Sequence, residues 1–272
     1  MKQYLDLLKQ VLFEGEERSD RTGVGTLSVF GTQTRYDLRE GFPLITTREI
    51  DMSVVVKELF WFLRGETNTK TLGAKIWDEW ADKDGELGPI YGQQWREWRE
   101  AGNLGGIDQI SRLVDGLIND PYSRRHIVSA WNVSDLDAMK LQPCHVMFQV
   151  YVSREGMDLH LYQRSADLAI GVPFNIASYS LLLHMLARAT GNRARYLIHS
   201  IGDAHIYKNH VQGVIEQLMR EPRPLPSVNV VLYDQIWTSR VFKDPAVWTP
   251  EKVDVRLTGY KPHPKIKFPI AV

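Results

Sequence analysis

The chain contains very little cysteine: Cys144 is the only one in 272 residues. A single cysteine excludes an intramolecular disulfide and is typical of a protein in a reducing compartment. The sequence also lacks an apolar run long enough to span a bilayer. Its first residues, 1–6, show no apolar signal core. These absences predict a cytoplasmic protein that makes no contact with a membrane.

Net charge is absent as well. Lys+Arg and Asp+Glu both number 33, so the formal net charge is +0. A neutral chain provides no electrostatic basis for sequence-independent binding of nucleic acid, and we expect no DNA binding. A local basic group can still hold a small phosphate. Arg21 in a glycine-containing loop and the adjacent Arg124 and Arg125 are candidates, the alternative for each being a solvated surface position.

Common nucleotide and metal motifs are missing. The chain has no Walker phosphate loop, and the short Gly-x-Gly at residues 23–25 lacks the third glycine of a dinucleotide-binding turn. It has no paired cysteines and no His-x-x-x-His pattern, and its histidines are scattered. We therefore expect no metal site.

The apolar pattern predicts both helices and strands. Helical spacing covers residues 2–14, 52–63, 107–118, 176–190 and about 209–220. Alternation predicts strands at 26–36, 127–130, 146–152, 157–162, 197–201, 228–233 and 253–257, with a short strand and turn at 42–47. Hydrophobic residues make up 43% of the chain, which is enough for a sizeable core. Without a repeat or a clear linker, the pattern favours one α+β domain over residues 1–272.

The residues that follow Cys144 favour a reactive thiol. Further along the chain, Arg164, Ser165, Asp167 and Asn175 supply a cation, a hydroxyl, a carboxylate and an amide. Cysteine attacks as its thiolate, and a nearby cation raises the thiolate fraction. The alternative is that a lone cysteine is simply a small buried hydrophobe.

An acid and an aromatic segment are further candidates. Glu58 lies among apolar residues of the helix predicted at 52–63, so it is either solvated on a polar face or buried with a raised pKa. Trp77, Trp80 and Tyr91 belong to an aromatic-rich segment. That segment suits either an irregular part of the core or the wall of a site for a flat ligand.

Ordered motifs run along nearly the whole chain. They are Asp20-Arg-Thr-Gly, Glu58-Leu-Phe-Trp-Phe-Leu, Trp77-Asp-Glu-Trp80, Leu87-Gly-Pro-Ile-Tyr-Gly92, Ser123-Arg-Arg, Pro143-Cys-His145, Tyr162-Gln-Arg-Ser-x-Asp167, Pro173-Phe-Asn175, Gly202-Asp-x-His-x-Tyr207, Arg220-Glu-Pro-Arg and Pro262-His-Pro264. In this combination the chain resembles the thymidylate synthase family. The resemblance implies a large mixed sheet covered by helices and a homodimer whose subunits meet sheet to sheet. It also implies a methyltransferase that converts dUMP to dTMP with 5,10-methylenetetrahydrofolate as one-carbon donor and reductant.

The resemblance assigns roles to individual residues. Cys144 would attack carbon 6 of the uracil, because carbon 5 is a poor nucleophile until that addition makes an enolate. Arg164 would favour the thiolate and bind phosphate, and Glu58 would serve proton transfers through ordered water. Tyr91 would assist removal of the proton on carbon 5. Asn175 would read the O4 and N3 edge of uracil, with His145 nearby.

The implied binding residues form two sets. The dUMP set is Arg21, Arg164, Ser165, Ala166, Asp167, Asn175, His205 and Tyr207, together with Arg124 and Arg125 of the partner subunit. The folate set is Asp51, Trp77, Trp80, Asp167, Gly171, Phe174 and Ala271. The apolar end of the chain, residues 269–272, would close over the ligands as a lid.

The chain departs from the family pattern after Thr47, where relatives usually carry basic residues that meet the glutamyl tail of the folate. Here only Arg48 is basic, while Glu49 and Asp51 are acidic, which predicts a weaker hold on polyglutamate. Two alternatives stay open. One is a dUMP hydroxymethylase, which shares the nucleophile but completes the reaction with water. The other is a non-catalytic nucleotide- or RNA-binding module.

Overall fold

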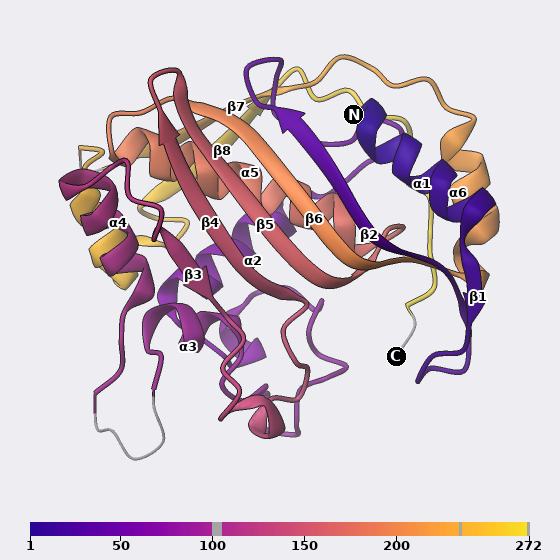
Figure 1. The fold of residues 1–272 in the computed structure, drawn as a ribbon, viewed down its shortest axis with the longest axis horizontal. Coiled ribbons are helices and arrows are strands. Elements are labelled where there is room, and N and C mark those ends of the chain that lie inside the picture. The colour runs from indigo at the N-terminus through magenta and orange to yellow at the C-terminus, as the bar shows by residue number, and fades with distance from the viewer. Residues whose placement is uncertain (100–104, 234–235, 271–272) are drawn as a thin grey trace.

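A six-stranded mixed sheet is the largest element of the fold (Figure 1). The structure is a computed structural model that describes residues 1–99, 105–233 and 236–270. The strand order is β1-β2-β6-β5-β4-β3, with β5 and β6 parallel and the other neighbours antiparallel. The strands are β1 (Glu16–Arg18), β2 (Thr26–Asp37), β3 (Ile127–Ser129), β4 (His145–Ser153), β5 (Gly156–Asp167) and β6 (Ala194–Tyr207). A separate antiparallel pair consists of β7 (Ser227–Leu232) and β8 (Val253–Thr258).

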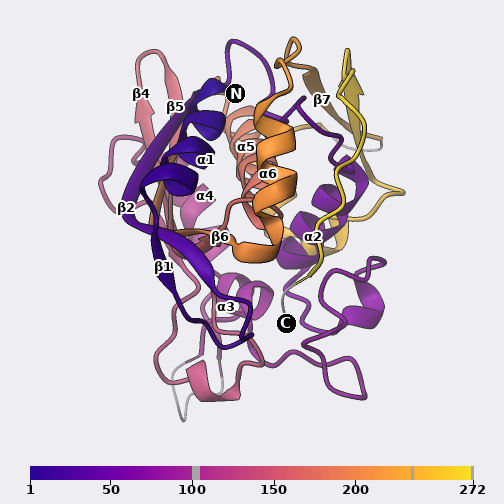
Figure 2. The same cartoon turned by 90° about the vertical axis from the view of Figure 1, so that its right-hand side faces the viewer.

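Helices cover one face of the large sheet. Figure 2 shows α2, α5 and α6 on the same side of the strands. The helices are α1 (Lys2–Glu14), α2 (Met52–Arg64), α3 (Tyr91–Arg96), α4 (Gln109–Asn119), α5 (Gly171–Ala189) and α6 (Val211–Leu218). α5 is apolar on almost every side and lies against β5 and β6, as expected of a central helix. Within the described residues, no helix combines the length and apolarity needed to cross a membrane.

The two faces of the sheet differ in burial. Phe148, Val150, Leu159 and Leu161 alternate inward from β4 and β5, and each is at most 1% exposed. Such alternation buries one face of an antiparallel pair and leaves the other in solvent. The outward side chain of Tyr151 is 58% exposed accordingly. In the part of the chain that the structure describes, no helix covers this outer face.

Local signals in the sequence explain how α2 and β4 are placed. Asp51 caps α2 by accepting a hydrogen bond from the backbone N–H of Ser53 at 2.9 Å. The helix ends where Gly65 adopts a left-handed conformation with φ 78°. β4 begins with an irregular register between His145 and Met147, directly after Cys144. Such irregularities re-aim side chains at the end of a strand.

The predicted α+β class with a large mixed sheet is confirmed, but several element predictions are wrong in detail. Residues 42–47 form no strand: Phe42 N–H donates to the carbonyl of Pro226 at 2.8 Å, and the hydroxyl of Thr46 donates to that of Arg223 at 3.1 Å. This buried segment therefore satisfies its polar groups against another loop. The chain also contains β1 and α3, which the pattern did not predict, and α6 is shorter than residues 209–220.

Candidate active site

The backbone around Cys144 is held from two elements. Its N–H donates to the phenol oxygen of Tyr91 in α3 at 2.7 Å. Its carbonyl accepts from the N–H of Arg164 in β5 at 2.9 Å. The half-buried thiol therefore stands where a helix, a strand end and a loop meet.

The guanidinium of Arg164 is fastened to the loop that carries the cysteine. Its Nε donates to the carbonyl of Pro143 at 3.0 Å, and Nη2 donates to that of Gln142 at 2.9 Å. Burial raises the pKa of the Cys144 thiol, and the charges of Arg164 and Arg21 oppose that rise without cancelling it. The effect of Arg164 has the direction that the sequence predicts. In the unliganded protein, however, burial prevails and the thiol form is favoured near neutral pH.

Glu58 faces inward from α2. The indole Nε1 of Trp77 donates to its Oε1 at 2.8 Å. Burial raises the pKa of Glu58 to about 7, and the hydrogen bond from Trp77 opposes the rise. Of the two alternatives that the sequence allowed, Glu58 is therefore buried with a raised pKa. A carboxyl group that titrates near neutrality can both give and take a proton at physiological pH.

His145 lies between two tyrosine rings. Its ring centroid is 5.1 Å from that of Tyr91 and 5.3 Å from that of Tyr179. Burial lowers the pKa of His145 to about 4 and raises the pKa of Tyr91 well above its ordinary value. Both groups are therefore neutral near pH 7, and they serve as hydrogen-bonding groups rather than as charges.

Several residues predicted to bind dUMP lie along the paired ends of β5 and β6. Asp167 in β5 pairs in register with His205 in β6, and Ser165 pairs with Asp203. Tyr207 follows His205 by two positions at the end of β6. The carboxylate of Asp167 accepts from the backbone N–H groups of Ala169 at 2.8 Å and Ile170 at 3.2 Å, so it is anchored at the start of α5. His205 Nδ1 lies 3.1 Å from Asp203 Oδ1. Parallel strands thus bring two distant motifs together.

Arg21 lies in a loop that is fixed by its neighbour. Oδ2 of Asp20 accepts from the N–H of Thr22 at 3.1 Å, and Oδ1 accepts from the N–H of Gly25 at 2.8 Å. The guanidinium of Arg21 itself is exposed, and its charge still lowers the pKa of Cys144. An exposed cation within electrostatic reach of the thiol suits an anionic ligand.

A pocket of about 220 Å³ opens beside Glu58. Its lining residues are Glu58, Ile76, Trp77, Trp80, Leu141, Ile170, Gly171, Phe174 and Asn175. Six of these were predicted as site residues from the sequence. Ile76, Leu141 and Ile170 were not among the predicted site residues, because isolated aliphatic residues carry no signal that separates a pocket wall from the core. The lining is apolar apart from Glu58 and Asn175, which suits a flat, largely apolar ligand with a polar edge.

Other predicted residues lie away from this pocket. Asp51 caps α2 and lines a separate cleft of about 680 Å³ together with Glu49, Arg223 and Tyr260. Arg124 and Arg125 are exposed and precede β3, at the opposite edge of the sheet from β1. Ala271 lies outside the described residues.

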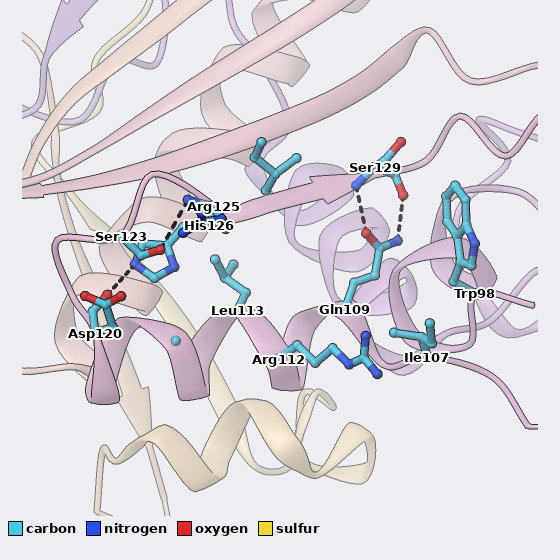
Figure 3. Close-up of a pocket in the computed structure, with 12 residues that line it drawn as sticks. Trp98, Ile107, Gln109, Arg112, Leu113, Asp120, Ser123, Arg125, His126 and Ser129 are labelled. Atoms are coloured by element: carbon cyan, nitrogen blue, oxygen red, sulfur yellow. Dashed lines mark hydrogen bonds between the residues drawn. The ribbon is translucent and has the colours of Figure 1, made fainter.

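Arg125 lines a cleft of about 520 Å³ between α4 and β3 (Figure 3). On one side of this cleft, the side-chain amide of Gln109 pairs with the backbone of Ser129, accepting from its N–H at 3.0 Å and donating to its carbonyl at 2.7 Å. This contact satisfies the free edge of β3, which would otherwise present unpaired backbone groups. Arg112 lines the same cleft.

Within residues 1–99, 105–233 and 236–270, no three His, Cys, Asp or Glu side chains gather as a metal site would require.

The site thus combines a cysteine held through its backbone, a buried acid and a largely apolar pocket. The family model described as thymidylate synthase matches residues 2–272, essentially the whole chain. The chain belongs to the thymidylate synthase family, whose members act on dUMP with methylenetetrahydrofolate as co-substrate.

Proposed function

We propose that the protein converts dUMP to dTMP, with Cys144 as nucleophile and 5,10-methylenetetrahydrofolate as co-substrate. The observation that carries this proposal is the buried carboxyl group of Glu58, with a pKa of about 7, which shares an otherwise apolar pocket with Asn175. Such a group can move protons at neutral pH without admitting bulk water. The free thiol that the reaction needs also fits a reducing, cytoplasmic location.

The covalent step begins at the sulfur. The Cys144 thiolate adds to carbon 6 of uracil, and the electron pair moves to carbon 5 and O4 as an enolate. Carbon 5 then forms a bond to the one-carbon unit and loses its proton. The folate supplies that unit and the hydride that reduces it to a methyl group. Expulsion of the thiolate releases dTMP, and dihydrofolate is the second product.

Protein groups support each proton movement. Burial favours the thiol form of Cys144, so the thiol must lose its proton when the nucleotide binds. Arg164 and Arg21 assist by stabilising the thiolate. The phenol of Tyr91 is neutral and accepts a hydrogen bond from the N–H of Cys144. In this proposal it assists removal of the proton on carbon 5. Glu58 serves proton transfer at the O4 side and at the folate.

Binding of dUMP uses the sheet end and the loops. Arg21, Arg164 and Ser165 hold the phosphate, with Arg124 and Arg125 of the partner subunit. His205 and Tyr207 hold the ribose hydroxyl, and Asn175 reads the base. Ala166 contributes backbone at the same strand end, where it pairs in register with Ala204.

The folate is held on the apolar side of the pocket. Trp77, Trp80 and Phe174 supply flat walls, and Gly171 leaves room at the first residue of α5. Asp167 hydrogen-bonds the pterin ring. Ala271 completes the cover in this proposal.

The outer face of the sheet supports a homodimer. This face lacks a helical cover in the described residues and presents Tyr151, Tyr162 and Ile127, which are 58%, 38% and 43% exposed. Large apolar side chains in one exposed patch are typical of an interface. A second copy packed sheet to sheet buries them, and the isologous contact brings Arg124 and Arg125 of each subunit to the other's site.

One assay tests the reaction. When dUMP and methylenetetrahydrofolate are mixed with the enzyme, a synthase forms dTMP together with dihydrofolate, which is detected by its absorbance. A hydroxymethylase forms product without oxidising the folate, and a binding module forms neither. The apolar lining of Trp77, Leu141 and Phe174 excludes water from the one-carbon unit and thus favours the synthase.

A further inference from the structure

Three buried polar side chains form a line from the centre of the sheet to Asn175. Nε2 of His199 in β6 lies 2.7 Å from Oε1 of Gln163 in β5. Nε2 of Gln163 donates to Oδ1 of Asn175 at 3.0 Å. His199, Gln163 and Asn175 are 0%, 3% and 8% exposed, so water has little access to this line. Of the three, only Asn175 lines the pocket.

A second, longer contact indicates the direction of the Gln163 amide. Its Nε2 also lies 3.4 Å from the backbone carbonyl of Ser165. A carbonyl only accepts hydrogen bonds, so the amino end of Gln163 faces Ser165 and Asn175. Its oxygen must then face His199, and His199 must donate from Nε2.

The surroundings of His199 favour that tautomer. Burial lowers its pKa to about 3, so the ring is neutral and carries one N–H. Its Nδ1 is buried without a hydrogen-bond partner in the described structure. A proton on Nδ1 would be an orphaned donor, which is costlier to bury than an unpaired acceptor. The proton therefore resides on Nε2, where Gln163 accepts it.

We propose that His199 is a positioning residue that sets the direction of the Asn175 amide and so selects a 4-oxo over a 4-amino pyrimidine nucleotide. The proposal rests on the function proposed above, in which Asn175 reads the base. With Oδ1 turned toward Gln163, Nδ2 of Asn175 is left to donate to a carbonyl at position 4 of the ring. An amino group at that position meets another donor and is rejected. If both amides were reversed, Nε2 of His199 would have to accept a hydrogen bond, and the ring proton would lie on its unpartnered Nδ1.

Binding measurements with dUMP and dCMP test the proposal without relying on turnover. His199→Phe keeps an aromatic ring but removes the donor at 2.7 Å, so only the longer 3.4 Å contact to Ser165 still opposes reversal of the Gln163 amide. We expect the ratio of dissociation constants for dCMP and dUMP to fall about tenfold in this variant. His199→Gln, which retains a donor near the position of Nε2, should keep most of the preference. His184→Phe is the matched control, because His184 is another histidine with its pKa lowered by burial, and its Nε2 is unpartnered in the described structure.

The outcomes distinguish the proposed role of the hydrogen-bonded line from His199 through Gln163 to Asn175, called the relay below, from the proposed reaction. Tight dUMP binding with an unchanged ratio in His199→Phe overturns the relay and leaves the proposed function intact. An equal loss for both nucleotides also overturns it, because that result indicates a purely structural role. Wild-type protein that binds neither nucleotide overturns the proposed function and the relay with it. If His199→Phe does not fold, the ¹⁵N spectrum of wild-type imidazoles decides: an Nε2–H tautomer for His199 supports the relay, and an Nδ1–H tautomer overturns it.

Discussion

The indole of Trp77 donates a hydrogen bond to the buried carboxyl group of Glu58 over 2.8 Å. Burial and this hydrogen bond act on the carboxyl group in opposite directions. Burial alone would raise its pKa further, and the indole, which stabilises the charged form, holds the pKa at about 7. Trp77 thereby tunes the group that we assign to proton transfer.

Trp77→Phe is expected to raise the pKa of Glu58. Because the folded-state pKa lies above the ordinary 4.5, Glu58 contributes stability that is fully present below about pH 4.5 and is lost as the pH rises through about 7. Without the indole donor, the loss of stability should continue to a pH about one unit higher. Urea unfolding of Trp77→Phe between pH 4 and 9, with and without Glu58→Gln, isolates the contribution of Glu58.

Trp80→Phe is the control for this prediction. Trp80 lines the same pocket, but its indole N–H has no partner in the described structure. Replacement of Trp80 should leave the pKa of Glu58 unchanged. If the two tryptophan variants show the same pH dependence, the hydrogen bond does not set the pKa.

Cys144→Ser should lower turnover by at least about a thousandfold while dUMP still binds. A serine hydroxyl keeps the shape, but it is a far weaker nucleophile than a thiolate at neutral pH. Turnover and the dissociation constant of dUMP should be measured on the same preparation. Alkylation of the wild-type thiol, slowed by dUMP, provides independent evidence of proximity. Turnover within tenfold of wild type would exclude Cys144 as the nucleophile.

Apolar spacing predicted most helices, because the buried face of a helix keeps its apolar period even when the other face is polar. It predicted only residues 197–201 of β6, whereas the strand runs from Ala194 to Tyr207. Gly202 and the polar residues after it break the apolar alternation, although the backbone ladder continues. Gly202 is needed there, since a Cβ would lie 2.7 Å from the carbonyl of Arg164.

For the site, motifs identified residues but not their environment. α5 begins at Gly171 rather than at Ile176, because Pro173 is tolerated in a first helical turn. Asn175 therefore lies on a rigid helix and not in the loop before it. The link from His199 to Gln163 was not predicted, since it joins neighbouring strands across 36 positions of sequence. Burial of Glu58 likewise depends on which face of α2 the sheet covers.

The proposed sharing of the phosphate site predicts complementation between inactive subunits. Arg125→Glu and Cys144→Ser should each be inactive, because each damages both sites of a homodimer. A mixed dimer holds one site with Cys144 from one chain and Arg125 from the other. Random exchange should therefore restore roughly a quarter of wild-type activity. Subunit exchange is verified by mass spectrometry, and activity is measured before and after mixing.

Arg112→Glu serves as the control for complementation. Arg112 lines the same cleft as Arg125 in its own subunit (Figure 3), but we assign it no role in the partner's site. Its variant should be active alone. Failure to recover activity after verified exchange of Arg125→Glu with Cys144→Ser would count against shared sites.

The acidic residues Glu49 and Asp51 predict a weak preference for polyglutamylated folate. The structure makes Glu49 the residue to test. Asp51 caps α2, so its replacement would cost about 1 kcal/mol of stability and confuse the result. Glu49 lies 3.8 Å from Lys265 in an exposed pair and lines the cleft of about 680 Å³. Glu49→Gln removes a negative charge and frees Lys265 to meet a glutamyl carboxylate. Because exposed pairs contribute about 0–1 kcal/mol, KM for the polyglutamate should fall by at most about fivefold.

The measurement compares KM for monoglutamyl and polyglutamyl cofactor at two ionic strengths. The gain from Glu49→Gln should be confined to the polyglutamate and should shrink at high salt, because screening weakens exposed charge pairs. Glu155→Gln is the matched control: Glu155 also pairs with a cation, Arg195 at 2.8 Å, but at the turn between β4 and β5. If wild type already prefers the polyglutamate strongly and Glu49→Gln adds nothing, the glutamyl tail does not pass Glu49.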